Sequence, residues 1–126
     1  MDGVNVTDNQ TSVVRMSSIS SCVILKGLGL NPIMQMVTRD RNRIAIQSDI
    51  LGAAALGINN ILCLTGDHQK FGDHASAKNV FDMDSIQLVQ TVKLMRDEGK
   101  FLGGRRVERK PQDVHWSSSQ PLCRSI

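Results

Sequence analysis

The sequence predicts an α/β fold in which three parallel strands alternate with three helices. Apolar segments of strand length begin at Val4, Ile33 and Asn60, and each is followed by a longer segment with helical periodicity. Strand starts 29 and 27 residues apart are typical of right-handed β-α-β crossovers, which place parallel strands in one sheet. An eight-unit barrel needs about 250 residues. A chain of 126 residues is therefore either a slice of such a barrel or a small flavodoxin-like domain.

The first unit comprises a β-branched strand at residues 3–7 and a helix at residues 11–26. Gly27 is the expected end of this helix. The helix is predicted from an apolar stripe with helical spacing. Its members are Val13, Val14, Met16, Ile19, Cys22, Val23 and Ile24.

The second unit comprises a strand at residues 33–37 and a helix at residues 42–56, which Gly57 ends. A charged run at residues 40–43, DRNR, separates the two elements. This run either binds phosphate or begins the helix with a solvated charged face, and the second interpretation is the more common one.

The third unit contains the segment on which the functional interpretation depends, NILCLTGDHQKFG at residues 60–72. Four consecutive apolar residues, 61–64, are typical of a parallel strand that is covered on both faces. Gly66 permits a sharp turn. Asp67 then follows at the carboxyl end of the strand, where parallel α/β folds bind their ligands. Asp67 is either such a binding carboxylate or a residue that caps the turn or the next helix.

A polar loop at residues 66–81 leads to the third helix at residues 84–98, for which Asp82 or Asp84 is the predicted N-cap. The loop also contains potential metal ligands, but their spacing matches no metal-binding motif. We therefore predict no metal site. These potential ligands are His68, Asp73 and His74.

Composition limits the classes of function. Five of the 15 basic residues and two of the 12 acidic residues lie in residues 105–126, which leaves ten of each in the first 104. The net charge of +3 thus belongs to the C-terminal segment rather than to a folded face, which argues against a nucleic-acid partner. The three cysteines form no CxxC pair, and Cys63 is predicted to be a small buried residue. Without a signal peptide or a membrane-spanning apolar run, we predict a cytoplasmic protein with no membrane partner.

Beyond these general features, the chain closely resembles the methylenetetrahydrofolate reductase family in two runs, TRDRNRIAIQSDILGAAALGINNILCLTGDH and GDHASAKNVFDMDSIQLV. The opening VNVTDNQTSVVRMSS is similar to the second barrel strand and helix of the same proteins. The resemblance covers residues 1 to about 112. It implies a partial (β/α)8 TIM barrel made of units two to four, with a flavin at the carboxyl ends of the strands.

The resemblance also implies an activity. NADH or NADPH reduces a bound flavin, expected to be FAD with FMN as the alternative, and methylenetetrahydrofolate is then reduced to methyltetrahydrofolate. The family's first strand, which carries a glutamate thought to act as general acid, has no counterpart in this sequence, and neither do units five to eight. We therefore expect a fragment that is inactive alone. The alternatives are a flavin-binding half-barrel module or a ligand-free relic. A homo-oligomer or a complementary chain would supply the missing units.

Matched by position, the resemblance implies that Asp67 binds the pterin and tunes the flavin, because a carboxylate accepts two N–H donors. Gln35 stands where other members have a flavin-contacting His, and Thr65 stands where some have Arg. Phe81 lies where a flavin-contacting Tyr occurs in some members. The remaining flavin contacts that the resemblance implies are Thr7, Leu64 and Gly66.

The last residues, 113–126, follow no helix or strand period and depart from the family pattern. A reverse translation with one base removed near codon 113 encodes MYIGAAANPFAD, which resembles the family's fifth strand. We therefore interpret residues 1–104 as the partial-barrel domain and residues 105–126 as a basic, irregular tail, which a single-base insertion has shifted out of frame from about residue 113 onward. A functional disordered tail rich in Ser and Arg is the alternative.

Overall fold

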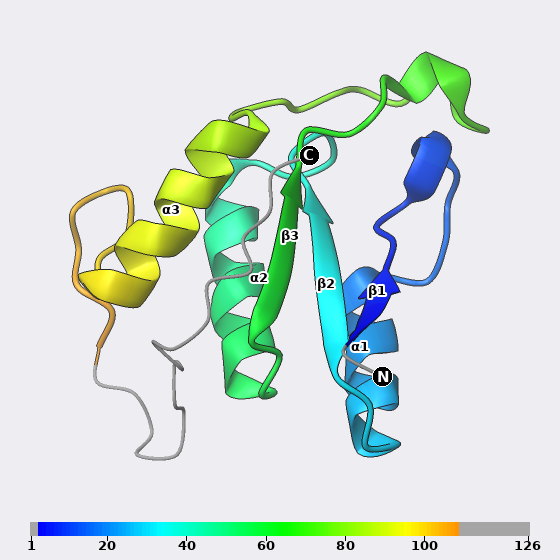
Figure 1. The fold of residues 1–126 in the computed structure, drawn as a ribbon. Coiled ribbons are helices and arrows are strands. Elements are labelled where there is room, and N and C mark those ends of the chain that lie inside the picture. The colour runs from blue at the N-terminus through cyan, green and yellow to red at the C-terminus, as the bar shows by residue number, and fades with distance from the viewer. Residues whose placement is uncertain (1–2, 109–126) are drawn as a thin grey trace.

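The computed structural model describes residues 3–108, which form one open sheet with helices packed on it (Figure 1). The sheet has three parallel strands in the order β1-β2-β3, with bounds Val4–Val6, Pro32–Val37 and Asn60–Leu64. The α-helices are α1, Ser18–Gly27, α2, Arg43–Ala55, and α3, Ser85–Asp97. The predicted α/β fold with three parallel strands is confirmed.

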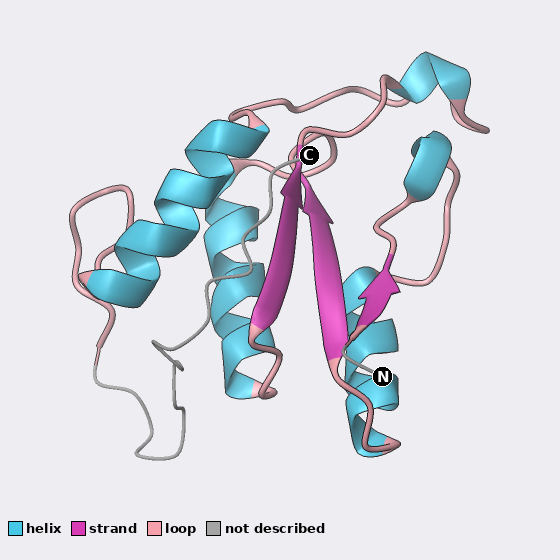
Figure 2. Ribbon diagram, in the orientation of Figure 1, coloured by secondary structure: helices cyan, strands magenta, loops and turns pink. Residues whose placement is uncertain are grey.

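The strands follow one another in space in the same order as in the chain. In Figures 1 and 2, α1 and α2 lie on the same side of the sheet, behind the strands, and α3 contacts β3 and α2. Successive right-handed crossovers in one direction place their helices on one face, as in a barrel. A flavodoxin-like sheet reverses direction and carries helices on both faces. The observed order therefore favours the barrel arrangement.

The core lies between the sheet and the helices. Met34 and Met36 of β2 are in register with Ile61 and Cys63 of β3, so these four side chains share one face of the sheet. They are buried together with side chains from all three helices. Cys63 is the small buried residue that the sequence predicted. Cys22 of α1 is buried as well, and burial raises the pKa of its thiol to about 11.

The first helix is shorter than predicted. The sequence indicated residues 11–26, whereas α1 begins at Ser18 and a 3-10 turn, η1, occupies Gln10–Ser12. Two residues of η1 have positive φ values of 55° and 59°, which a continuous helix does not allow. Ser17 caps α1 instead, because its hydroxyl accepts the N–H of Ser20 at 3.3 Å.

By contrast, α2 and α3 begin and end within one residue of their predicted bounds, and both begin at strong capping side chains. The Asn42 side chain accepts the N–H groups of Ile44 and Ala45. Asp84, rather than Asp82, caps α3 in a capping box. Its carboxylate accepts the N–H of Gln87 at 2.8 Å, and the Gln87 side chain accepts the N–H of Asp84 at 3.0 Å.

Asp84→Ala is expected to lower the free energy of unfolding by about 1 kcal/mol, because it removes the acceptor that satisfies an orphan N–H of the first turn. Urea unfolding followed by circular dichroism measures this loss. Asp73→Ala, at an exposed position in the loop before α3, is the matched control. Equal effects of the two substitutions would contradict the capping role of Asp84.

The segment after α3 turns back on itself. An antiparallel bridge pairs Lys100 with Arg106, so the first residues of the predicted tail, 105–126, contact the segment that follows α3. The domain boundary at residue 104 and the frameshift near residue 113 stay predictions, and residues 109–126 lie outside the described range. Within residues 3–108, no helix combines the length and apolarity needed to span a bilayer.

Candidate functional site

A cavity of about 280 Å³ lies at the carboxyl ends of the three strands. The segment after β1, the end of β2 and the turn after β3 all contribute to its lining. Five of the seven site residues predicted from the sequence are among the lining residues. These five are Gln35, Leu64, Thr65, Gly66 and Asp67.

The two other predicted residues do not line this cavity. Thr7 is half-buried and follows β1 in the chain. The next residue, Asp8, does line the cavity. Phe81 lies at the far end of the loop before α3, with 36% of its surface exposed and a φ of 40°. Their contacts with a flavin stay predictions.

The turn after β3 presents its main chain to the cavity. Gly66 has a φ of 91°, and a Cβ at this position would lie 3.2 Å from the Cβ of Val37, so both conformation and space favour glycine. The hydroxyl of Thr65 accepts the N–H of Ser85 at 3.1 Å, and its carbonyl accepts the N–H of Arg39 at 3.1 Å. Thr65 therefore joins the turn to α3 and β2.

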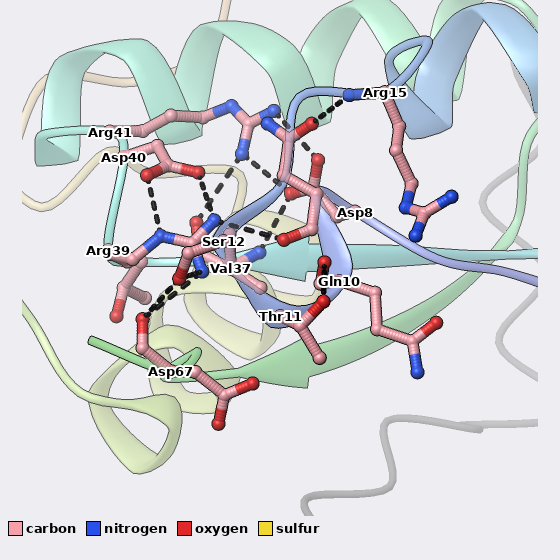
Figure 3. Close-up of polar contacts among 12 residues, drawn as sticks. Asp8, Gln10, Thr11, Ser12, Arg15, Val37, Arg39, Asp40, Arg41 and Asp67 are labelled. Carbon is pink, nitrogen blue, oxygen red and sulfur yellow. Dashed lines mark hydrogen bonds and ion pairs between the residues drawn. The ribbon is translucent and has the colours of Figure 1, made fainter. Parts of the chain in front are cut away.

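Two side chains at the cavity are available to bind a ligand. The carboxylate of Asp67 and the amide of Gln35 make no hydrogen bond to any residue between 3 and 108. The main-chain carbonyl of Asp67, in contrast, accepts hydrogen bonds from Ser12 Oγ and Arg39 Nη1, both at 3.1 Å. Figure 3 shows the carboxylate pointing away from these two donors. The main chain of Asp67 is thus held while its acid group stays available.

Arg39 is a buried residue of the site that the sequence did not single out. It is 3% exposed, and its guanidinium forms a bidentate ion pair with Asp40 at 2.7 and 2.6 Å. Hydrogen bonding by Arg39 lowers the pKa of Asp40. Because the folded-state pKa is lowered, this pair stabilises the fold above the unfolded pKa of about 3.9, and the stabilisation is lost as the pH falls further.

A second buried ion pair borders the cavity next to β1. Asp8 is 2% exposed and accepts from Arg41 Nη1 at 2.6 Å and Nη2 at 3.2 Å. The same carboxylate accepts the N–H of Val37 at 3.0 Å. Because β1 ends at Val6, the side chain of Asp8 replaces a strand carbonyl as partner for the last residue of β2.

The charged run at residues 40–43 belongs to these internal contacts. Arg41 pairs with Asp8, and Arg43 pairs with Asp82 at 2.8 Å, where hydrogen bonding lowers the pKa of Asp82 to about 2. The structure therefore supports a charged helix start rather than a phosphate site. The run of charged residues after β2 was the only sequence signal for these ion pairs. It did not identify the acidic partners of Arg41 and Arg43, which lie 33 and 39 residues away in the chain.

The loop before α3 contains two histidines that the sequence indicated as potential metal ligands, His68 and His74. His68 caps a 3-10 turn, η2, at Gln69–Phe71, and its Nδ1 accepts the N–H of Lys70 at 3.3 Å. His74 is exposed. In the part of the chain that the structure describes, no group of three or more His, Cys, Asp or Glu side chains is arranged to hold a metal ion.

Comparison with known proteins identifies one family. Its model, described as methylenetetrahydrofolate reductase, matches residues 1–111. No curated protein and no solved structure matches the chain. The matched range includes every strand and helix described above and all residues that line the cavity.

Proposed function

The chain belongs to the methylenetetrahydrofolate reductase family, and we propose that the cavity at its strand ends is where a flavin and a folate meet. The main support is that two side chains with no hydrogen bond to any residue from 3 to 108, the carboxylate of Asp67 and the amide of Gln35, share one cavity with the glycine turn. This cavity lies at the carboxyl edge of a parallel sheet, which is the edge that barrel enzymes use for catalysis.

The residues of the cavity fit the ring system of such a ligand. The volume of the cavity, about 280 Å³, lies just below the usual range for ligand pockets, roughly 300–1,000 Å³. A cavity of this size suits a ring but not a whole dinucleotide. The amide of Gln35 offers both donors and an acceptor to a heterocycle, and Asp67 accepts N–H groups. We propose FAD as the cofactor. FMN is the alternative, because the two flavins share the same ring and differ only outside it.

A bound flavin would supply hydride transfer from NADH or NADPH to methylenetetrahydrofolate. The contribution of the chain itself is orientation and charge. Asp67 would accept two hydrogen bonds from the pterin and hold it in one orientation. Its negative charge beside the flavin ring would disfavour added negative charge there and so tune the reduction equilibrium.

We also propose that the sheet forms units two to four of a (β/α)8 barrel and that this chain alone does not complete the reduction. Among the described residues that line the cavity, the acids are Asp8 and Asp67, and Asp8 is held by Arg41. No second free acid is left in this lining to protonate the folate as its methylene bridge opens. A complementary chain or a second copy, paired with the outer edges of β1 and β3, would supply the rest.

Titration of the full chain with FAD and FMN, followed by quenching of flavin fluorescence, tests this proposal. We expect binding of the flavin by the wild-type chain. We also expect no turnover when methylenetetrahydrofolate and NADH or NADPH are added to the flavin-loaded chain. Absence of flavin binding would refute the proposed site and favour a ligand-free relic.

Asp67→Asn is expected to weaken the binding of folate to the flavin-loaded chain about tenfold or more, because it removes hydrogen bonds to a charged acceptor. A fluorescence titration with folate measures the affinity. Asp73→Asn, in the same loop but outside the cavity lining, should bind as the wild type does. Equal affinities of the wild type and Asp67→Asn would exclude Asp67 as the pterin ligand.

A further inference from the structure

We infer that Arg39 is a positioning residue whose guanidinium holds the turn after β3 against the segment after β1 and thereby fixes the place of Asp67. This inference rests on the proposed role of Asp67 in ligand binding. Arg39 itself is not proposed to touch the ligand.

The guanidinium of Arg39 joins the ends of all three strands (Figure 3). Arg39 follows β2, and its Nη2 donates to the carbonyl of Asn9 at 3.3 Å, after β1. Its Nη1 donates to the hydroxyl of Ser12 at 2.9 Å and to the carbonyl of Asp67 at 3.1 Å, after β3. Ser12 extends the connection, because its hydroxyl also lies 3.2 Å from the carbonyl of His68. One side chain therefore controls the spacing of three loops.

Charge and burial explain why arginine suits this position. A buried cation is costly unless it is paired, and Asp40 neutralises Arg39 through two short contacts. The planar guanidinium still has N–H groups left over for the carbonyls of Asn9 and Asp67. Lysine has a compact charge and no rigid fork, so it would not hold these partners at once.

The main chain of Arg39 reinforces the same connection. Its N–H donates to the carbonyl of Thr65 at 3.1 Å, and its carbonyl accepts the N–H of Val80 at 2.8 Å. Both ends of the loop before α3 are thus fixed to residue 39 by main-chain bonds that any side chain would retain. Between these two ends, near the start of the loop, the carbonyl of Asp67 depends on the side chain of Arg39. Arg39 also lines a second cavity of about 170 Å³, as does Asn9.

Hydrogen–deuterium exchange on the full chain tests the inference. In Arg39→Met we expect the amides of residues 66–72 to exchange at least tenfold faster than in the wild type, while those of β2 and α2 keep their rates. Arg96→Met is the matched control, because Arg96 also pairs with the next residue, Asp97, at 2.6 Å but does not line either cavity. The control should exchange as the wild type does at residues 66–72.

Chemical rescue distinguishes positioning from general support of the fold. In Arg39→Ala, millimolar methylguanidinium should restore slow exchange at residues 66–72, whereas in Arg39→Met the methionine occupies the space and no rescue is expected. Unchanged exchange in Arg39→Met, or no rescue of a folded Arg39→Ala, would overturn the inference.

Ser12→Ala decides the question if the Arg39 variants do not fold. It removes only the hydroxyl between Arg39 and the carbonyls of the loop. We expect faster exchange confined to residues 66–72, and wild-type exchange there would overturn the inference. Flavin and folate titrations of the same samples separate the two proposals. If the wild-type chain binds neither ligand, but the variants exchange faster than the wild type at residues 66–72 as expected, the proposed function is refuted and the role of Arg39 is retained.

Discussion

Asp8→Ala is expected to lower the free energy of unfolding by about 3 kcal/mol. The substitution leaves Arg41 without its main partner and the N–H of Val37 without an acceptor. Removal of one member of a buried ion pair costs about 3–5 kcal/mol, and the remaining contact of Arg41 with Asp49, at 3.1 Å, keeps the loss near the lower limit. Chemical denaturation of the full chain measures the difference.

Two further variants separate the parts of this effect. Asp49→Ala removes the more exposed partner of Arg41 and should cost no more than about 1 kcal/mol. Asp8→Asn keeps an acceptor for the N–H of Val37 but removes the charge, so its cost should lie between the other two. Similar losses for Asp8→Ala and Asp49→Ala would show that the buried carboxylate is not the principal partner.

Gly72→Ala is expected to destabilise the protein by about 3 kcal/mol and to release the loop before α3. The φ of Gly72 is −103°, so conformation does not require glycine. The requirement is close approach, because a Cβ at this position would overlap the carbonyl group of Ser12 in η1. Main chain cannot rotate away as a side chain can, which places the cost at the upper end of the range for overpacking.

Denaturation and tryptic cleavage after Lys70 measure this effect. Cleavage should be faster in Gly72→Ala because η2 loses its packing against η1. Gly52→Ala is the control with the opposite expected sign. A Cβ at Gly52 meets nothing within 4 Å, and alanine in a helix is favoured over glycine by about 0.5–1 kcal/mol. Unchanged cleavage and stability in Gly72→Ala would contradict the contact between the two turns.

Sequence patterns did not identify Asp8, Gly72 or Ser12 as residues that connect the strand ends. Ser12 was assigned to a helix because apolar residues follow it with helical spacing. The structure instead places it in η1, where it contacts Arg39 and the loop after β3. A helical period reports only on neighbours three or four residues apart, so it did not show a contact between residues 12 and 67.

The order and bounds of most elements were determined by the sequence alone, because apolar runs, helix caps and glycine stops act over a few residues. Asp84 and Gln87 show this for α3, and the apolar run that includes Cys63 shows it for β3. The position of Asp67 directly after a strand was also local information. The family followed from the longer match of residues 1–111.

Only the tertiary structure decided which residues meet at the strand ends. The register of β1, β2 and β3 brings Asp8 to Arg41 and Arg39 to Asp67, across 33 and 28 residues of chain. It also places Gln35 beside the turn at Gly66 and leaves Phe81 outside the cavity. These contacts depend on the alignment of separate strands, and the free energy of an ion pair depends on its burial. Neither quantity is contained in the pattern of any single segment.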